Sequence, residues 1–433
     1  MNLQEIKRVI ASQREEMGEK FRRTKIIKRE VGFEKLKGVL SHPNILAILG
    51  IRRCGKSVFA WQLLEEEKFG HINFDDERLF GIRPTELDLV LQAFYELYGD
   101  LDFVVLDEPQ NVVGWELFVN RLRLNKRVVV TGSNSRLLGG ELATHLTGRH
   151  VDFTLTPFSF REHLAYTGVD FSPESLGSAK KVSEIKRRLE EYVRMGGMPE
   201  AHLFGREILV RIYADIVERD VLGRLRIRRG QAFREFAKYL ASNIGSEYTY
   251  SKLSHIFDIK DVHTVRNWLG GLQAAYLYFS LERYSPKLKE SVIAPKKLYC
   301  LDNGLALAIS LKEGRVGRLI ENVVAVELLR RRFYWAPFEV YYWKDHAQRE
   351  VDFVLKVGDR VDSLIQVSYA SDEGDIEKRE ITALVKAGDT LKCRNTTIIT
   401  WDYEGELKTE NMTIECTPLW KWLLKQPSNT ESN

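Results

Sequence analysis

The stretch that most constrains this chain is Asn44 to Ser57, which reads NILAILGIRRCGKS. An apolar run from Ile45 to Leu49 predicts a short buried strand, and the pattern from Val58 to Glu67 predicts a helix. Between them, four residues match the phosphate-binding pattern G-x-x-x-x-G-K-[ST]: Gly50, Gly55, Lys56 and Ser57. Glycines suit this loop because its backbone N–H groups must surround an anion without interference from Cβ atoms. The strand before the motif and the helix after it predict a nucleotide site.

Each residue type in the loop has a chemical role in that prediction. Lys56 would neutralise the β- and γ-phosphates, and the hydroxyl of Ser57 would hold Mg²⁺. The positive end of the following helix would point at the phosphates. The residues expected to contact the nucleotide are Gly50, Arg52, Arg53, Cys54, Gly55, Lys56, Ser57 and Val58.

Composition sets wider bounds. The chain has 433 residues, 44% hydrophobic and 29% charged, which predicts a globular protein of two to four domains. A net charge of +4 neither demands nor excludes nucleic acid, so local patches must decide. The four cysteines are widely spaced and suggest neither a zinc site nor a disulfide framework. We see no signal peptide and no membrane span, so we expect a cytoplasmic protein with no membrane partner.

A second strong signal is LDFVVLDEPQ, from Leu101 to Gln110. The apolar run from Phe103 to Leu106 predicts a buried strand that ends in Asp107 and Glu108. An acidic residue at such a strand end can hold the Mg²⁺ shell, and the adjoining one can polarise the attacking water. We therefore assign Asp107 to Mg²⁺ and Glu108 to the general base.

Other polar groups follow neighbouring strands. Asp75 and Asp76 either support water and Mg²⁺ or form an ordinary polar loop. After the predicted strand at 127–131, Ser133 and Asn134 either sense the γ-phosphate, with Asn134 the catalytic candidate, or form a simple turn.

An arginine candidate follows in the same region. Arg149 precedes a predicted strand, a position from which it would reach a neighbouring subunit's site, and Arg136 is its rival. The alternative for either arginine is a surface salt bridge.

These motifs together carry a resemblance. GIRRCGKS, INFDDERL, VVLDEPQNVVGWE, VVVTGSNSRLL and LTGRHVDFTLTPFSFREHL resemble the archaeal and bacterial AAA-type ATPases related to the STAND signal-transduction class. The similarity covers about Lys28 to Gly168. It implies the additional-strand, catalytic-glutamate version of the P-loop fold, ATP and Mg²⁺ as cofactors, and assembly into a homo-oligomer.

The whole chain is predicted to be α/β, with a P-loop parallel sheet followed by a helical winged-helix domain and a C-terminal α/β restriction-endonuclease-like domain. The predicted segments are a charged N-terminal helix (1–28), the ATPase domain (29–168), a helical connector (169–232), the winged helix (233–315) and the nuclease-like domain (316–433).

The middle of the chain offers two candidate DNA contacts. Four arginines without an intervening acid form a basic patch: Arg224, Arg226, Arg228 and Arg229. Three short helical patterns and a basic hairpin then predict a winged helix-turn-helix, whose third helix would present His263 and Arg266. The hairpin lysines expected at phosphates are Lys287, Lys289, Lys296 and Lys297. The alternatives are charged helix ends for the patch and a protein-contact module for the winged helix.

The last third resembles the PD-(D/E)XK nuclease-like fold over about Gly317 to Trp401. Glu321 and Asp352 match its carboxylates, and Glu350 is a nearby spare. The third-strand E-x-K becomes Gln366-Val367-Ser368, which lacks both a good Mg²⁺ ligand and the cation. Lys378 and Arg379 are the candidates to replace that cation. We favour a degenerate, non-cleaving domain over an active nuclease.

Taken together, the sequence predicts an ATP-hydrolysing AAA-type protein that acts on DNA. Two alternatives stay open. One is a STAND-like switch in which the nucleotide controls a protein partner, and the other is a metal-dependent DNA endonuclease.

Overall fold

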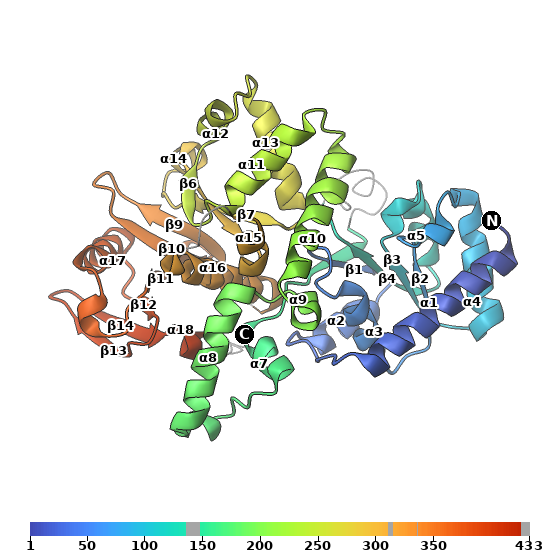
Figure 1. Cartoon of the computed structure of the whole chain (residues 1–433), viewed down its shortest axis with the longest axis horizontal. Helices are drawn as coiled ribbons and strands as arrows, with labels where there is room; N and C mark the ends of the chain where they lie inside the picture. Colours follow the sequence, from blue (N-terminus) through green and yellow to red (C-terminus); the bar gives the residue numbers. More distant parts are fainter. Residues whose placement is uncertain (136–147, 311–314, 336, 426–433) are drawn as a thin grey trace. The chain divides into compact units, whose positions relative to one another are not determined.

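The computed structural model describes residues 1–135, 148–310, 315–335 and 337–425, and Figure 1 draws the chain. Two compact units divide it: residues 1–156 with 274–276, and residues 157–273 with 277–433. The α7 helix (Phe160–Thr167), which the sequence analysis places in the ATPase domain, falls in the second unit. No helix in the described ranges is long and apolar enough to cross a membrane.

The first unit is a five-stranded parallel sheet in the order β2-β3-β4-β1-β5. Its strands are β1 (Ile45–Leu49), β2 (Phe69–Asn73), β3 (Phe103–Asp107), β4 (Arg127–Gly132) and β5 (His150–Thr154). Its helices are α1 (Leu3–Arg23), α2 (Phe33–Leu40), α3 (Lys56–Leu63), α4 (Leu87–Tyr98) and α5 (Trp115–Leu122). Because β4 lies between β1 and β3, the expected additional-strand arrangement is confirmed.

Burial explains this sheet. All five residues of β1 are buried, as expected for a central parallel strand that helices cover on both faces. The N-terminal helix α1 contributes Ile6, Val9 and Ile10 to the same core cluster as β1 and β3, and it contacts α4 and β2 (Figure 1). The amphipathic N-terminal segment therefore packs on the core of the first unit.

The second unit begins with helices and continues into a nine-stranded sheet, β13-β14-β12-β11-β10-β9-β7-β8-β6. Its longer helices are α8 (Ala179–Met195), α10 (Glu207–Asp215), α11 (Gly230–Ala241), α13 (Val262–Ala274), α16 (Val316–Tyr334) and α17 (Lys378–Leu391). Its short helices are α9 (Pro199–Phe204), α12 (Tyr250–Ile256), α14 (Leu288–Ile293), α15 (Asn303–Ile309) and α18 (Leu419–Leu424). Its strands are β6 (Ser246–Tyr248), β7 (Tyr278–Arg283), β8 (Lys296–Cys300), β9 (Glu339–Lys344), β10 (Glu350–Val357), β11 (Arg360–Ser368), β12 (Thr396–Thr400), β13 (Gly405–Lys408) and β14 (Thr413–Pro418).

One strand pair joins the two parts that the sequence analysis treats as separate domains. β7 pairs in parallel with β9, with Glu282 opposite Tyr341 and Arg283 opposite Tyr342. The backbone N–H of Tyr284 also donates to the Tyr342 carbonyl at 2.7 Å. The β6-β8-β7 strands and the C-terminal strands therefore form one continuous sheet, which brings β8 close to the C-terminal carboxylates.

Two adjacent histidines in the second unit give a pH prediction. The ring centroids of His163 and His202 lie 5.0 Å apart, and neither ring nitrogen of His163 has a hydrogen-bond partner in the described structure. Burial lowers the pKa of His163 to about 3 and that of His202 to about 4.

An unfolded histidine has a pKa of about 6.5, so below that pH the unfolded chain binds protons that the folded chain excludes. Their contribution to stability is therefore present above about pH 6.5 and is lost as pH falls toward 4, by at most about 1.4 kcal/mol per pH unit for each histidine. Urea unfolding of wild type and His163→Phe between pH 7.5 and 4.5 checks this: the variant should lose stability less steeply. Equal slopes would contradict it.

Candidate functional site

The predicted phosphate loop connects β1 to α3. Gly50 has φ +149° and Gly55 has φ +97°, a region that favours glycine. A Cβ atom on Gly50 would lie 2.2 Å from the Leu155 carbonyl oxygen, so the backbones approach too closely for any side chain. The α3 helix begins at Lys56, two residues earlier than the sequence predicts. Both glycines are therefore required by the loop geometry.

Lys56 is the cation of this loop. Its side chain is only 6% exposed, and its Nζ donates to the carbonyl oxygens of Gly50 (3.1 Å) and Ile51 (3.2 Å). The same Nζ lies 3.8 Å from Glu108 Oε1. The loop lysine and the acidic end of β3, which are far apart in sequence, therefore meet.

The side chain of Asp107 is almost fully buried, at 1% exposure. His71 Nε2 lies 2.8 Å from its Oδ2, and the Thr131 hydroxyl donates to its Oδ1 at 2.7 Å. Burial alone would raise the pKa of Asp107, but the hydrogen bonds from His71, Thr131 and Ser57 outweigh burial and lower it. Asp107 therefore stays ionised beside the Ser57 hydroxyl.

Glu108 follows directly and has an unusual backbone, with φ +48°. Its Oε2 accepts hydrogen bonds from Gln110 Nε2 and from Ser133, whose hydroxyl lies 3.3 Å away. Its backbone N–H donates to the Thr131 carbonyl at 3.2 Å. The carboxylate is therefore held at the strand ends, next to Lys56.

The remaining loop residues differ in environment. The guanidinium of Arg52 lies 3.6 Å from Asp75, Arg53 is exposed with φ +64°, and Val58 lies in α3. Cys54 is buried with its thiol 3.4 Å from the Leu155 carbonyl, and burial raises its pKa. Cys54 is therefore a packing residue of the loop.

Ser133 and Asn134 follow β4 and are both buried, Ser133 against Glu108. A γ-phosphate sensing role for Asn134 stays a prediction.

His71 and Arg29 escaped the sequence analysis of this site, and so did the contact between Thr131 and Asp107. His71 and Thr131 lie inside strands, and only the pairing of β2 and β4 with β3 brings them to Asp107. Arg29 is 5% exposed and donates to the carbonyls of Cys54 (3.2 Å) and Thr156 (2.6 Å). Its guanidinium therefore connects the phosphate loop to the segment that follows β5. The sequence signal for Arg29 is only a basic run.

Arg149 lies at the opposite end of the sheet from the loop. Its carbonyl accepts from Ile45 N, at the start of β1, and its guanidinium donates to Asn120 Oδ1 at 3.2 Å. It is exposed, so it does not serve the site of its own chain, and a role in a neighbour's site stays a prediction. Arg136 falls outside the described residues.

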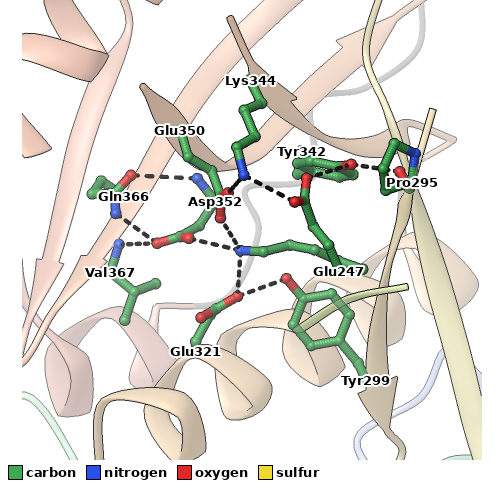
Figure 2. Close-up of polar contacts among 11 residues, drawn as sticks. Glu247, Pro295, Tyr299, Glu321, Tyr342, Lys344, Glu350, Asp352, Gln366 and Val367 are labelled. Atoms are coloured by element: carbon green, nitrogen blue, oxygen red, sulfur yellow. Dashed lines mark hydrogen bonds and ion pairs between the residues drawn. The ribbon is translucent and has the colours of Figure 1, made fainter. Parts of the chain in front are cut away.

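The predicted nuclease carboxylates also come together, in the second unit. Glu321 on α16, Glu350 and Asp352 on β10, and Gln366 on β11 point toward one another in Figure 2. Lys297 Nζ lies among them, 2.9 Å from Glu321 Oε1, 2.6 Å from Glu350 Oε1 and 3.1 Å from Asp352 Oδ1. We call Lys297 with these three acids the carboxylate centre. Its lysine is buried at 3% exposure.

Further polar groups complete the carboxylate centre. Asp352 Oδ2 accepts from Gln366 Nε2 (2.8 Å) and from the Val367 N–H (3.1 Å). The Tyr299 hydroxyl donates to Glu321 Oε1 at 2.8 Å. Lys344 Nζ lies 3.2 Å from Glu350 and 2.9 Å from Glu247 (Figure 2). Each acid of the centre therefore accepts from at least two donors.

Charge and burial compete inside the centre. Burial first, and then the neighbouring Glu321, raises the pKa of Asp352 to about 7. Burial would lower the pKa of Lys297, but Glu321, Asp352 and Glu350 outweigh burial and raise it well above the usual value. Lys297 therefore carries a full positive charge at any physiological pH.

Lys297 corrects one sequence prediction. The sequence analysis places it on a hairpin that contacts phosphates, but it lies on β8 with its amine buried in the carboxylate centre. Side chains alternate along a strand, so Lys296 points the other way and its Nζ lies 2.6 Å from Glu282 Oε1.

Among the described residues, no group of three or more His, Cys, Asp or Glu could hold a metal ion. Arg379, the predicted substitute cation, pairs with Glu377, and Lys378 is exposed at the start of α17.

The predicted DNA contacts lie on the surface of the second unit. The exposed ones are Arg224, Arg226, Arg228, Arg229, His263, Arg266, Lys287 and Lys289. A Cβ atom on Gly271 of α13 would lie 2.6 Å from Leu225, so the arginine segment packs directly against α13. The arginine patch and the helix with His263 and Arg266 are therefore neighbours.

Comparison with known proteins gives the family. A model described as an AAA domain matches residues 42–164, and two models described as domains of unknown function match residues 186–315 and 316–421. A protein of Methanocaldococcus jannaschii, "Uncharacterized protein MJ1544", is 32% identical over 425 residues, which cover 93% of this chain and 92% of that protein. The chain belongs to the family of this archaeal protein. A Haemophilus influenzae relative is 29% identical over 92% of this chain and 99% of its own length.

Two solved structures are similar as well. The Walker-type ATPase PABY2304 of Pyrococcus abyssi has a TM-score of 0.44 and 17% identity, covering 66% of this chain and 96% of its own. The STAND protein PH0952 of Pyrococcus horikoshii, with a tetratricopeptide repeat sensor, has a TM-score of 0.26 and 10% identity, covering 72% and 50%. The AAA-domain match over residues 42–164 agrees with the parallel sheet and the phosphate loop of the first unit.

Proposed function

We propose that this chain binds and hydrolyses Mg²⁺-ATP and uses the cycle to act on DNA. One observation carries the ATPase part: the acidic end of β3 meets the phosphate loop, with Lys56 Nζ 3.8 Å from Glu108 Oε1. A hydroxyl, an ionised aspartate, a cation and a second carboxylate are the groups that triphosphate hydrolysis requires.

Each group has a distinct task. The donor set suits Mg²⁺, because the Ser57 hydroxyl and the Asp107 carboxylate are hard oxygen ligands, and Ser57 helps to lower the pKa of Asp107. When bound, Mg²⁺ would neutralise charge on the β- and γ-phosphates. Lys56 would exchange its two carbonyl contacts for phosphate oxygens. Glu108, oriented by Gln110 and Ser133, would accept the proton of the attacking water.

The DNA part rests on the second unit. The order α11-β6-α12-α13-β7-α14-β8, with β8 antiparallel to both β6 and β7, favours a winged helix in which the short helix α14 lies between the two strands of the wing. His263 and Arg266 on α13 are exposed, and the arginine patch packs beside that helix. A basic surface next to a recognition helix favours phosphate contacts together with groove contacts.

Two measurements test the ATPase part and the DNA part of the proposal. Phosphate release from ATP should require Mg²⁺ and rise when duplex DNA is added, and fluorescence anisotropy should show DNA binding that weakens with salt. Replacing Arg224, Arg226, Arg228 and Arg229 by Ala should weaken DNA binding at least tenfold and remove the stimulation, with basal turnover unchanged.

A charge-matched control replaces four exposed basic residues elsewhere in the second unit: Lys180, Arg187, Arg211 and Arg332. This control should keep its DNA response. If the chain does not turn over ATP, the proposed ATPase activity is wrong. If added DNA does not change the rate of ATP turnover, the result favours the alternative function, a switch that controls a protein partner.

A further inference from the structure

The carboxylate centre has the acids of a metal site but the geometry of an ammonium site. Its three acceptor oxygens lie 2.6–3.1 Å from Lys297 Nζ, and each belongs to a different carboxylate. An ammonium group has three N–H donors, so every donor has one partner. Oxygen ligands of Mg²⁺ lie at about 2.0–2.1 Å, and the lysine amine occupies the point where such an ion would lie.

Charge balance leads to the same conclusion. Lys297 binds all three acids, and Lys344 binds Glu350 from the other side at 3.2 Å. The two lysines together bring the two positive charges of a divalent ion. The other oxygen of Asp352, Oδ2, accepts hydrogen bonds from Gln366 and Val367, so this carboxylate does not depend on a metal. The residues present therefore do not fit a divalent metal while Lys297 is in place.

We infer that the Lys297 ammonium is the permanent cation of this carboxylate centre, that it excludes divalent metal, and that it ties β8 to α16 and β10. In the sheet, β7 and β9 separate β8 from β10, and the long side chain of Lys297 spans that separation to reach Asp352. The centre is thus a structural ion cluster, and the chain lacks metal-dependent nuclease chemistry at this position.

Metal titration tests the exclusion. Mn²⁺ is added to the full chain without nucleotide, in a Ser57→Ala background that removes the predicted loop ligand, and free Mn²⁺ is followed by its EPR signal. With Lys297 intact, Asp352→Asn should not change the binding curve. Lys297→Ala should gain about one Mn²⁺ per chain, and adding Asp352→Asn should remove it. Lys296→Ala, on the same strand but paired outside the centre, is the matched control and should gain none.

Two results would overturn the inference. One is an Mn²⁺ ion bound to the Lys297-containing chain and lost in Asp352→Asn. The other is a folded Lys297→Ala variant that gains no Mn²⁺.

Thermal unfolding tests the structural role even where Lys297→Ala folds poorly. Lys297→Met should lower Tm on the order of 10 °C, because three carboxylates are left facing one another without their cation. Adding Glu321→Gln and Asp352→Asn should recover a large part of that loss. A Lys297→Met protein as stable as wild type would contradict the proposed role, and so would a triple variant less stable than Lys297→Met.

Discussion

Replacing Glu108 by Gln is expected to reduce ATP turnover by about 10²–10³-fold while ATP still binds, because the amide cannot accept the proton of the attacking water. The substitution keeps the shape of the side chain and the possible contacts with Gln110 and Ser133. It also removes the negative charge 3.8 Å from Lys56 Nζ, so ATP affinity should be equal or higher. Single-turnover phosphate release and binding of a fluorescent ATP analogue measure the two effects separately.

The matched control is Glu77→Gln, which makes the same chemical change at an exposed acid after β2. Its turnover should stay within about twofold of wild type. A Glu108→Gln enzyme with near wild-type turnover would exclude Glu108 as the base. Another acid at the strand ends would then be the candidate.

Replacing Lys56 by Ala is expected to weaken ATP binding on the order of 10²-fold, and turnover with it. Lys56 is the buried cation of the loop, and each hydrogen bond from a charged donor to a phosphate contributes about 1.5–3 kcal/mol. Titration of the fluorescent analogue in Mg²⁺ measures the change. Lys37→Ala, which removes a partly exposed lysine paired with Glu66 in the same unit, should bind as wild type does.

Loop integrity needs its own control in that experiment, because Lys56 also donates to the carbonyls of Gly50 and Ile51. Thermal unfolding of the nucleotide-free variant separates a loosened loop from a lost phosphate contact. Full ATP affinity in a folded Lys56→Ala protein would remove the loop from the proposed mechanism.

Parts of the candidate site followed from local sequence alone. The glycines, lysine and serine of the loop are neighbours along the chain, and their conformation depends on residues within a few positions. Asp107 and Glu108 follow a buried apolar strand, and parallel strands bring their carboxyl ends to one edge of the sheet. The approach of Lys56 to Glu108 was therefore predictable. His71 was not, because its position inside an apolar strand carries no signal of the carboxylate beside it.

Local sequence patterns were sufficient to predict the P-loop fold of the first unit and the residues expected at a nucleotide, because a strand, a glycine loop and a helix are encoded over short distances. They also located Glu321, Asp352 and Gln366, and they showed that the third-strand lysine of the nuclease pattern is missing. The tertiary structure was needed to identify Lys297 as the cation that lies among these acids. Lys297 resembles any hairpin lysine in sequence, and its amine meets Glu321 and Asp352 because β7 pairs with β9 and carries β8 into the same sheet. Such strand pairing joins residues far apart along the chain, and no local pattern records it.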